Sequence, residues 1–159
     1  MNDLIETLSN LNLTISSCES FTGGLFASSL TSISGVSKVY KGSLVTYNNE
    51  LKEELLGIEH KLIEDLGVIN ETVALYMARK TLRLTNSDYC VSFTGNAGPI
   101  PMEGKAVGLC YISVVSRKFE LVSEYRFKGS RNRIRRSAIN KACRIIMELL
   151  RKESNTNVQ

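Results

Sequence analysis

Residues 106–127, AVGLCYISVVSRKFELVSEYRF, contain two long runs rich in β-branched and aromatic residues. The polar triplet at 116–118 separates them, and this spacing predicts a β-hairpin with strands at 106–115 and 119–127. A hairpin in this position pairs its strands antiparallel, so any sheet that contains it is not purely parallel. This stretch therefore decides the kind of sheet that the chain forms.

The part of the chain before the hairpin alternates strands with helices. Strands are expected over 14–18, 39–47 and 88–93. Apolar spacing and capping residues predict helices over 2–11, from Leu25, up to Gly57, over 71–85 and from Ser130 onward, with a short helical piece within 58–69. The pattern predicts an α/β fold, a single-domain sandwich with a mixed β-sheet flanked by helices.

Composition indicates one globular domain that needs neither metal nor disulfides. The 159 residues are 43% hydrophobic and 23% charged, and no apolar run approaches the length of a membrane span. The start of the chain does not resemble a signal peptide, so a cytosolic (cytoplasmic) protein without a membrane partner is expected. The four cysteines form no C-x-x-C pair, and with a single histidine, His60, a zinc site is not expected.

The charge is unevenly distributed along the chain. Segment 126–152 holds ten of the 20 Lys and Arg residues and only one of the 16 acidic residues, Glu148. The body of the protein is therefore mildly acidic and its carboxy-terminal segment strongly basic. This asymmetry points to an anionic partner, either the phosphate of a small ligand or a nucleic acid.

Two loops that contain Thr-Gly each follow a predicted strand. They are residues 20–24, SFTGG, and residues 92–99, SFTGNAGP. In open α/β sheets ligands bind beyond the carboxyl ends of the strands, where such loops converge. Small residues and glycines allow backbone N–H groups to approach a phosphate or a developing oxyanion. Taken alone, each loop is better explained as an ordinary turn that needs glycine.

Arg131 lies just inside the start of the last predicted helix, where a cation opposes the helix dipole. Arg135 follows one turn later, and both border the apolar face of the helix. A substrate phosphate held between Arg131, the backbone at residues 130–131 and Arg135 would offset the unfavourable charge.

Residues 19–24, ESFTGG, resemble the E-S-C-T-G-G motif of the CinA carboxy-terminal domain family, the nicotinamide-nucleotide amidases. The resemblance continues in order through residues 47–52 (YNNELK), 94–99 (TGNAGP) and 127–131 (FKGSR). It implies that residues 1–153 form a CinA C-terminal-like amidohydrolase domain, with 154–159 as a frayed tail. The implied reaction is the deamidation of nicotinamide mononucleotide to nicotinate mononucleotide and ammonia, in pyridine nucleotide salvage, without a cofactor.

The resemblance places the catalytic serine and lysine at Ser20 and Lys52. Lys52 lies in the first turn of its predicted helix, where the dipole lowers the pKa of an amine and lets it accept the proton of Ser20. Tyr47 is the third catalytic candidate and would orient Lys52 or the amide, and Glu19 would hold its loop or a ribose hydroxyl. The full set of candidate substrate-binding residues is Glu19, Thr22, Gly23, Gly24, Thr94, Gly95, Asn96, Ala97, Gly98, Arg131 and Arg135.

The sequence also departs from the family pattern, and two other functions stay open. Phe21 replaces the motif cysteine, and residues 100–104, IPMEG, replace a glycine-rich stretch that should border the site. The altered loop motivates the alternative of a catalytically inactive CinA-like domain that binds ligands or partners. Nucleic-acid binding by the basic segment is less favoured, because its helix buries one face and offers no aromatic residues for base stacking. A homo-oligomer is expected.

Overall fold

The structure, a computed structural model, describes residues 1–156 and contains one mixed β-sheet. Its strands are β1 (Ile15–Glu19), β2 (Tyr40–Val45), β3 (Tyr89–Gly95), β4 (Leu109–Ser116) and β5 (Glu120–Arg126), in the order β2-β1-β3-β4-β5. β1 pairs in parallel with both β2 and β3, whereas β4 is antiparallel to β3 and to β5. The predicted α/β class, the mixed sheet and the late hairpin are confirmed.

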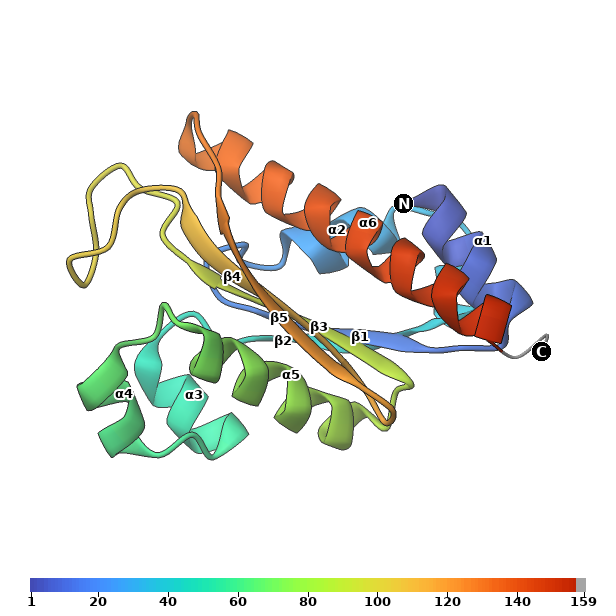
Figure 1. The fold of residues 1–159 in the computed structure, drawn as a ribbon, viewed down its shortest axis with the longest axis horizontal. Coiled ribbons are helices and arrows are strands. Elements are labelled where there is room, and N and C mark those ends of the chain that lie inside the picture. Colours follow the sequence, from blue (N-terminus) through green and yellow to red (C-terminus); the bar gives the residue numbers. More distant parts are fainter. Residues whose placement is uncertain (157–159) are drawn as a thin grey trace.

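Helices cover both faces of the sheet (Figure 1). One face carries α1 (Asn2–Asn10), α2 (Leu25–Thr31) and α6 (Arg131–Thr156), and the other carries α3 (Asn49–Leu56), α4 (His60–Leu66) and α5 (Glu71–Thr85). A short 3-10 helix, η1 (Val36–Lys38), precedes β2. Within the described residues no helix has both the length and the apolar character needed to span a membrane.

Each face of the sheet has its own apolar cluster, and side-chain alternation along the strands separates the two. Cys110 and Ile112 of β4 belong to the cluster under α1, α2 and α6, whereas Leu109 belongs to the cluster under α3–α5. In the same way Ile15 and Cys18 of β1 face opposite sides. All seven residues of β3 are buried, as expected for the central strand.

Most boundaries differ from the sequence prediction by one or two residues, and two differences are more informative. β4 begins at Leu109 rather than residue 106, because Gly108 has a φ of +92°, which a strand does not adopt. A Cβ at residue 108 would lie 1.9 Å from the Phe127 carbonyl oxygen, so this position requires glycine. α6 runs to Thr156, past the expected start of the tail at residue 154, and the rest of that tail lies outside the described residues.

The start of α5 offers a test of the fold that does not depend on function. Asn70 accepts a hydrogen bond from the N–H of Val73 at 2.9 Å, and its amide donates to the carbonyls of Gly67 and Leu66. Replacing Asn70 with Ala should therefore lower the free energy of unfolding by about 1 to 2 kcal/mol. Urea denaturation measures the change. Asn140→Ala, in an exposed position of α6, is the control and should cause no loss.

Candidate active site

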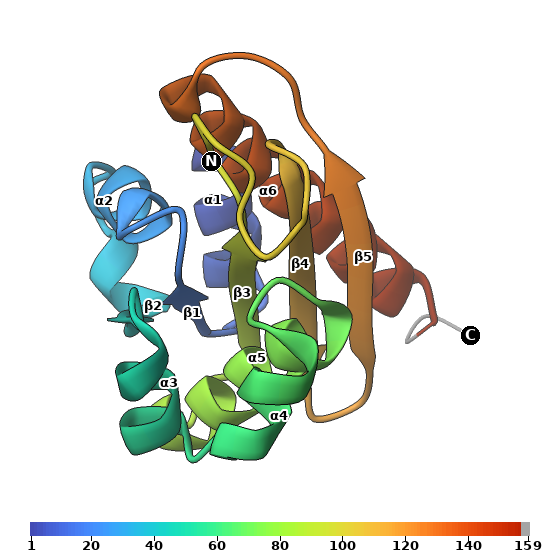
Figure 2. The ribbon, with the colours of Figure 1, turned by 90° about the vertical axis from the view of Figure 1, so that its left-hand side faces the viewer.

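A cavity of about 270 Å³ opens at the carboxyl ends of β1 and β3, the end of the sheet that faces the viewer in Figure 2. Both Thr-Gly loops contribute to its wall, as the strand order predicts for loops that follow neighbouring parallel strands. Its lining residues are Ser20, Phe21, Tyr47, Gly95, Asn96, Ala97, Gly98, Ile100, Pro101, Met102 and Arg131.

Ser20 is fixed by an extension of the β1–β3 ladder. Its N–H donates to the Phe93 carbonyl at 3.0 Å, one residue beyond the last paired residue of β1, and its own carbonyl accepts from the Gly23 N–H at 2.9 Å. Gly23 and Gly24 have φ angles of 57° and 87°, which glycine adopts without strain. The turn therefore holds Ser20 at the cavity wall and leads directly into α2.

Glu19 does not line the cavity and is fully buried. Its carboxylate accepts hydrogen bonds from the N–H groups of Phe26 at 3.1 Å and Ala27 at 2.9 Å, in the first turn of α2. A carboxylate at this position satisfies free N–H groups and interacts favourably with the helix dipole. Of its two expected roles, the structure provides the contacts for holding the loop.

Lys52 is buried completely, which is unusual for a lysine. Its Nζ donates to the carbonyls of Thr46 at 2.7 Å and Asn48 at 3.3 Å. Burial lowers the pKa of Lys52 to about 8, against the opposing influence of Cys18 and Glu103. The lowered pKa agrees with the sequence argument, but burial is its main cause rather than the helix dipole.

Lys52 does not line the cavity, but a short chain of contacts joins it to the strand end that carries Ser20. Thr46, whose carbonyl accepts from Lys52, donates its own N–H to the Glu19 carbonyl at 2.9 Å. The hydroxyl of Thr46 also lies 3.7 Å from the sulfur of Cys18. The amine therefore sits beside the last residues of β1, on the face that Cys18 occupies.

The two arginines of α6 have different contacts. Arg131 lines the cavity, where its guanidinium donates to the Tyr47 hydroxyl at 2.7 Å and to the Gly98 carbonyl. Arg135 lies outside the cavity lining and donates from Nε and Nη2 to the Thr22 carbonyl, at 3.2 and 2.6 Å. Arg131 thus joins two walls of the cavity, whereas Arg135 holds the loop that bears Ser20.

The remaining polar candidates are mostly engaged within the protein. The Thr94 hydroxyl donates to the Val68 carbonyl at 2.5 Å. The Asn96 amide donates to the Ile100 carbonyl at 3.0 Å and accepts from the Gly98 N–H at 2.8 Å. The buried hydroxyl of Thr22 has no hydrogen-bond partner within the described residues. Thr94 therefore attaches the end of β3 to the segment before α5, and Asn96 holds its own loop together. At Gly95 and Gly98 the cavity wall is formed by the backbone alone.

Sequence reasoning missed the residues that attach this loop to the rest of the protein. The Glu103 carboxylate accepts from the N–H groups of Val68 at 2.9 Å and Ile69 at 3.3 Å, and Lys105 donates to the Ile69 carbonyl at 2.6 Å. Nothing in the spacing of Glu103 signals this contact. The prediction that the altered loop borders the site is confirmed, since Ile100 lines the cavity.

The site thus offers a hydroxyl, a buried amine of lowered pKa and a guanidinium. Among residues 1–156, no three His, Cys, Asp or Glu side chains gather as a metal ion would require. A hydroxyl and an amine of lowered pKa at one strand end suit nucleophilic chemistry on a carbonyl group. Fold and site together define a compact α/β domain with a cavity of this kind at the carboxyl ends of its parallel strands.

Comparison with known proteins gives the family. Residues 1–150 match the model of the CinA C-terminal domain, and the chain belongs to that family. It is 40% identical over 138 residues, 87% of its length, to a putative competence-damage inducible protein of Bacillus subtilis. It is 38% identical over 152 residues, 95% of its length, to a protein of the same description from Oceanobacillus iheyensis. The chain spans about a third of the length of these curated relatives, 33% and 36%.

Solved structures share the fold over nearly the whole chain. The competence/damage inducible protein CihA of Agrobacterium tumefaciens is 32% identical, with a TM-score of 0.89 over 93% of this chain and 92% of that one. A CinA superfamily protein from Klebsiella pneumoniae has a TM-score of 0.91, with 94% of each chain covered, at 23% identity. The second likeness shows the fold alone.

The buried amine makes a prediction about stability. Folding shifts the pKa of Lys52 from 10.5 to about 8, so the folded state disfavours the ammonium, and Lys52 lowers stability most at pH values below about 8. The stability of the wild-type protein relative to Lys52→Met should therefore rise by about 2 kcal/mol between about pH 7 and about pH 9.5. Urea denaturation of both proteins at each pH measures this change.

The matched control is Lys61→Met, which replaces an exposed lysine of α4. Its difference from wild type should stay constant over the same pH range, because an exposed amine gains or loses little on folding. Equal pH dependence in the two variants would contradict the burial of a titrating amine at Lys52.

Proposed function

We propose that this domain hydrolyses the carboxamide of nicotinamide mononucleotide to nicotinate mononucleotide and ammonia, with Ser20 as nucleophile and Lys52 as base. The observation that carries the proposal is the completely buried amine of Lys52, with its pKa lowered to about 8, beside the strand end that presents Ser20. An amine that is partly neutral near pH 7 can accept a proton from a hydroxyl.

The alternation of side chains along β1 supports a position of the two groups on one face of the sheet, with no hydrogen bond between them among the described residues. Cys18 faces the side of the sheet that α3 and α5 cover, and Glu19 faces α2 on the other side. Because Ser20 continues the hydrogen-bond ladder, its side chain falls on the face of Cys18, where Lys52 of α3 also lies. The same face therefore carries the nucleophile and the base.

In the proposed reaction the Ser20 oxygen attacks the carboxamide carbon while Lys52 takes the hydroxyl proton. The tetrahedral intermediate places negative charge on the former carbonyl oxygen, which the backbone N–H groups of Phe21 and Ala97 at the cavity wall can stabilise. Lys52 then returns the proton to the nitrogen, the C–N bond of the intermediate breaks, and ammonia leaves behind an acyl-enzyme on Ser20. Water, activated by the neutral Lys52, releases the nicotinate product and restores Ser20.

The rest of the cavity suits the phosphate and the pyridine ring of the substrate. Arg131 supplies a guanidinium at the wall, and an anion there would offset its unfavourable place at the start of α6. Phe21, Ile100 and Met102 give the wall an apolar part that can receive a pyridine ring. Arg135 acts through the Thr22 carbonyl and is a positioning residue in this scheme.

A catalytically silent ligand-binding domain is the second candidate. It is favoured by one observation, that Lys52 donates to two backbone carbonyls and lies outside the cavity lining. In that case the cavity would bind the mononucleotide without turnover. Calorimetric binding without ammonia release over hours would support this candidate, and measurable turnover would exclude it.

Replacing Ser20 with Ala tests the nucleophile. The variant should lose at least about a thousandfold in the rate of ammonia release from nicotinamide mononucleotide, because no other group can form the acyl-enzyme. A coupled ammonia assay in the presence of a chelator measures the rate. Ser28→Ala, at an exposed position of α2, is the control and should keep the wild-type rate. Unchanged turnover in Ser20→Ala would refute the assignment.

The pH dependence of the reaction tests the base. Only neutral Lys52 accepts a proton, so kcat/KM should rise with pH and level off above a midpoint near the pKa of about 8. The exposed His60 has a raised pKa through its hydrogen bond to Glu53 and must be distinguished from Lys52. His60→Gln should leave the midpoint unchanged. A rate independent of pH between about 6 and 9 would contradict the role of Lys52.

A further inference from the structure

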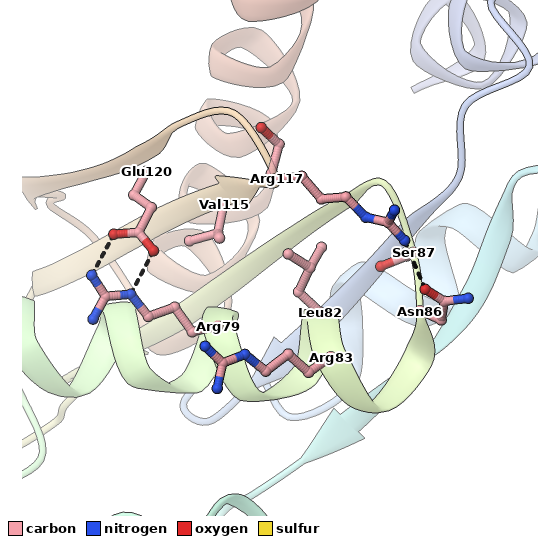
Figure 3. Close-up of a pocket in the computed structure, with 9 residues that line it drawn as sticks. Arg79, Leu82, Arg83, Asn86, Ser87, Val115, Arg117 and Glu120 are labelled. Atoms are coloured by element: carbon pink, nitrogen blue, oxygen red, sulfur yellow. Dashed lines mark hydrogen bonds and ion pairs between the residues drawn. The ribbon is translucent and has the colours of Figure 1, made fainter.

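A second and larger cavity, of about 450 Å³, lies at the opposite end of the sheet (Figure 3). It opens between the carboxyl end of α5 and the β4–β5 hairpin, beside Ser87, which precedes β3. The first cavity lies past the other end of β3, so the seven residues of this strand separate the two by roughly 20 Å. The second cavity is therefore distinct from the candidate active site.

Guanidinium groups dominate the charge of this cavity. It is lined by Arg79 and Arg83 of α5, by Arg117 of the hairpin turn and by one carboxylate, Glu120. Arg79 forms a two-pronged ion pair with Glu120, with Nε 2.5 Å from Oε1, and this pair is internally neutralised. The positive charges of Arg83 and Arg117 are left without a carboxylate of their own.

The two remaining arginines lie on either side of an apolar floor. Figure 3 shows Leu82 and Val115 facing one another between the helix and the hairpin, with Arg83 and Arg117 on different sides of them. Arg117 is held in place by its hydrogen bond to Asn86 Oδ1 at 2.9 Å. The Arg83 guanidinium has no hydrogen bond or ion pair with another described residue.

Each arginine also has a structural explanation, but together these do not account for the site. Arg79 connects α5 to β5, and Arg83 in the last turn of α5 offsets the negative end of the helix dipole. Arg83 nevertheless shares the cavity with Arg117, so two positive charges remain beside the Arg79–Glu120 pair, and Glu120 interacts with Arg83 only at longer range. An anionic ligand would relieve this concentration of positive charge.

We infer that this cavity binds a small phosphate ester that carries a flat aromatic ring. A nucleoside monophosphate is a simple compound of this class. Arginine binds phosphate through paired N–H groups, and its planar face also stacks on aromatic rings. Leu82 and Val115 close the base of the cavity and are themselves buried, so the planar faces of the arginines would receive the flat part of the ligand. The volume falls within the range of pockets that hold small ligands.

Calorimetry on the full chain tests the inference, with adenosine monophosphate as the probe. It should bind at least about tenfold more tightly than inorganic phosphate or adenosine, because only the ester uses both the charge and the planar faces of the guanidinium groups. Replacing Arg83 and Arg117 together with Gln should weaken the binding by at least about tenfold. Arg83→Gln alone should give a smaller loss in the same direction.

Two controls assign the result to this cavity. Arg133→Gln with Arg136→Gln removes the same charge from exposed positions of α6 and should leave binding unchanged. Arg131→Gln removes the guanidinium of the other cavity, which can also take a mononucleotide under the proposed function, and should leave in place the component of binding that Arg83→Gln with Arg117→Gln weakens. The inference is overturned if the wild type binds no probe at millimolar concentration, if Arg83→Gln with Arg117→Gln binds as well as wild type, or if Arg131→Gln abolishes binding. None of these outcomes depends on ammonia release.

Discussion

The parallel pairing of β1 with β3 is the constraint on which the candidate site depends. Both strands end at the same edge, and the ladder continues for one more hydrogen bond, from the Ser20 N–H to the Phe93 carbonyl. That bond fixes the nucleophile candidate directly against the loop that follows β3. A turn rich in glycine can then reverse the chain into α2 without displacing Ser20, because Gly23 and Gly24 accept positive φ angles.

Burying a lysine lowers the stability of the folded protein, and backbone carbonyl groups offset part of this loss by accepting hydrogen bonds from the amine. Lys52 receives two carbonyl acceptors, from Thr46 and Asn48, instead of a carboxylate partner. A carboxylate in contact would raise its pKa and hold it as an ammonium, whereas neutral carbonyls leave the effect of burial dominant. Cys18 and Glu103 oppose the lowering of its pKa without a hydrogen bond to Nζ, and burial prevails over both. This arrangement suits a base, and a solvated lysine would not need it.

The sequence predicted the fold class and the convergence of two loops, since both follow from local patterns. Alternating strands and helices followed by a hairpin permit few topologies, and neighbouring parallel strands bring their following loops together. The partners of side chains were not predictable in this way. Arg135 contacts the carbonyl of a residue 113 positions earlier, and the burial of Lys52 depends on α3 packing against α5 and on the amine reaching the segment after β2. The expected oligomer and cellular location stay predictions.

The loop at residues 100–104 shows how a departure from a family pattern can keep a site intact. Its sequence lacks the glycines of the family, yet Glu103 anchors it to the backbone of Val68 and Ile69, and the Asn96 amide spans its base. The anchoring groups are the Glu103 carboxylate, the Asn96 amide and the Lys105 amine, so the side chains of residues 100–102 are free to vary. Ile100 and Met102 then project large apolar side chains at the cavity mouth, where glycines would leave it open. The change therefore alters the apolar wall of the cavity, and through Glu103 it also opposes the lowering of the Lys52 pKa.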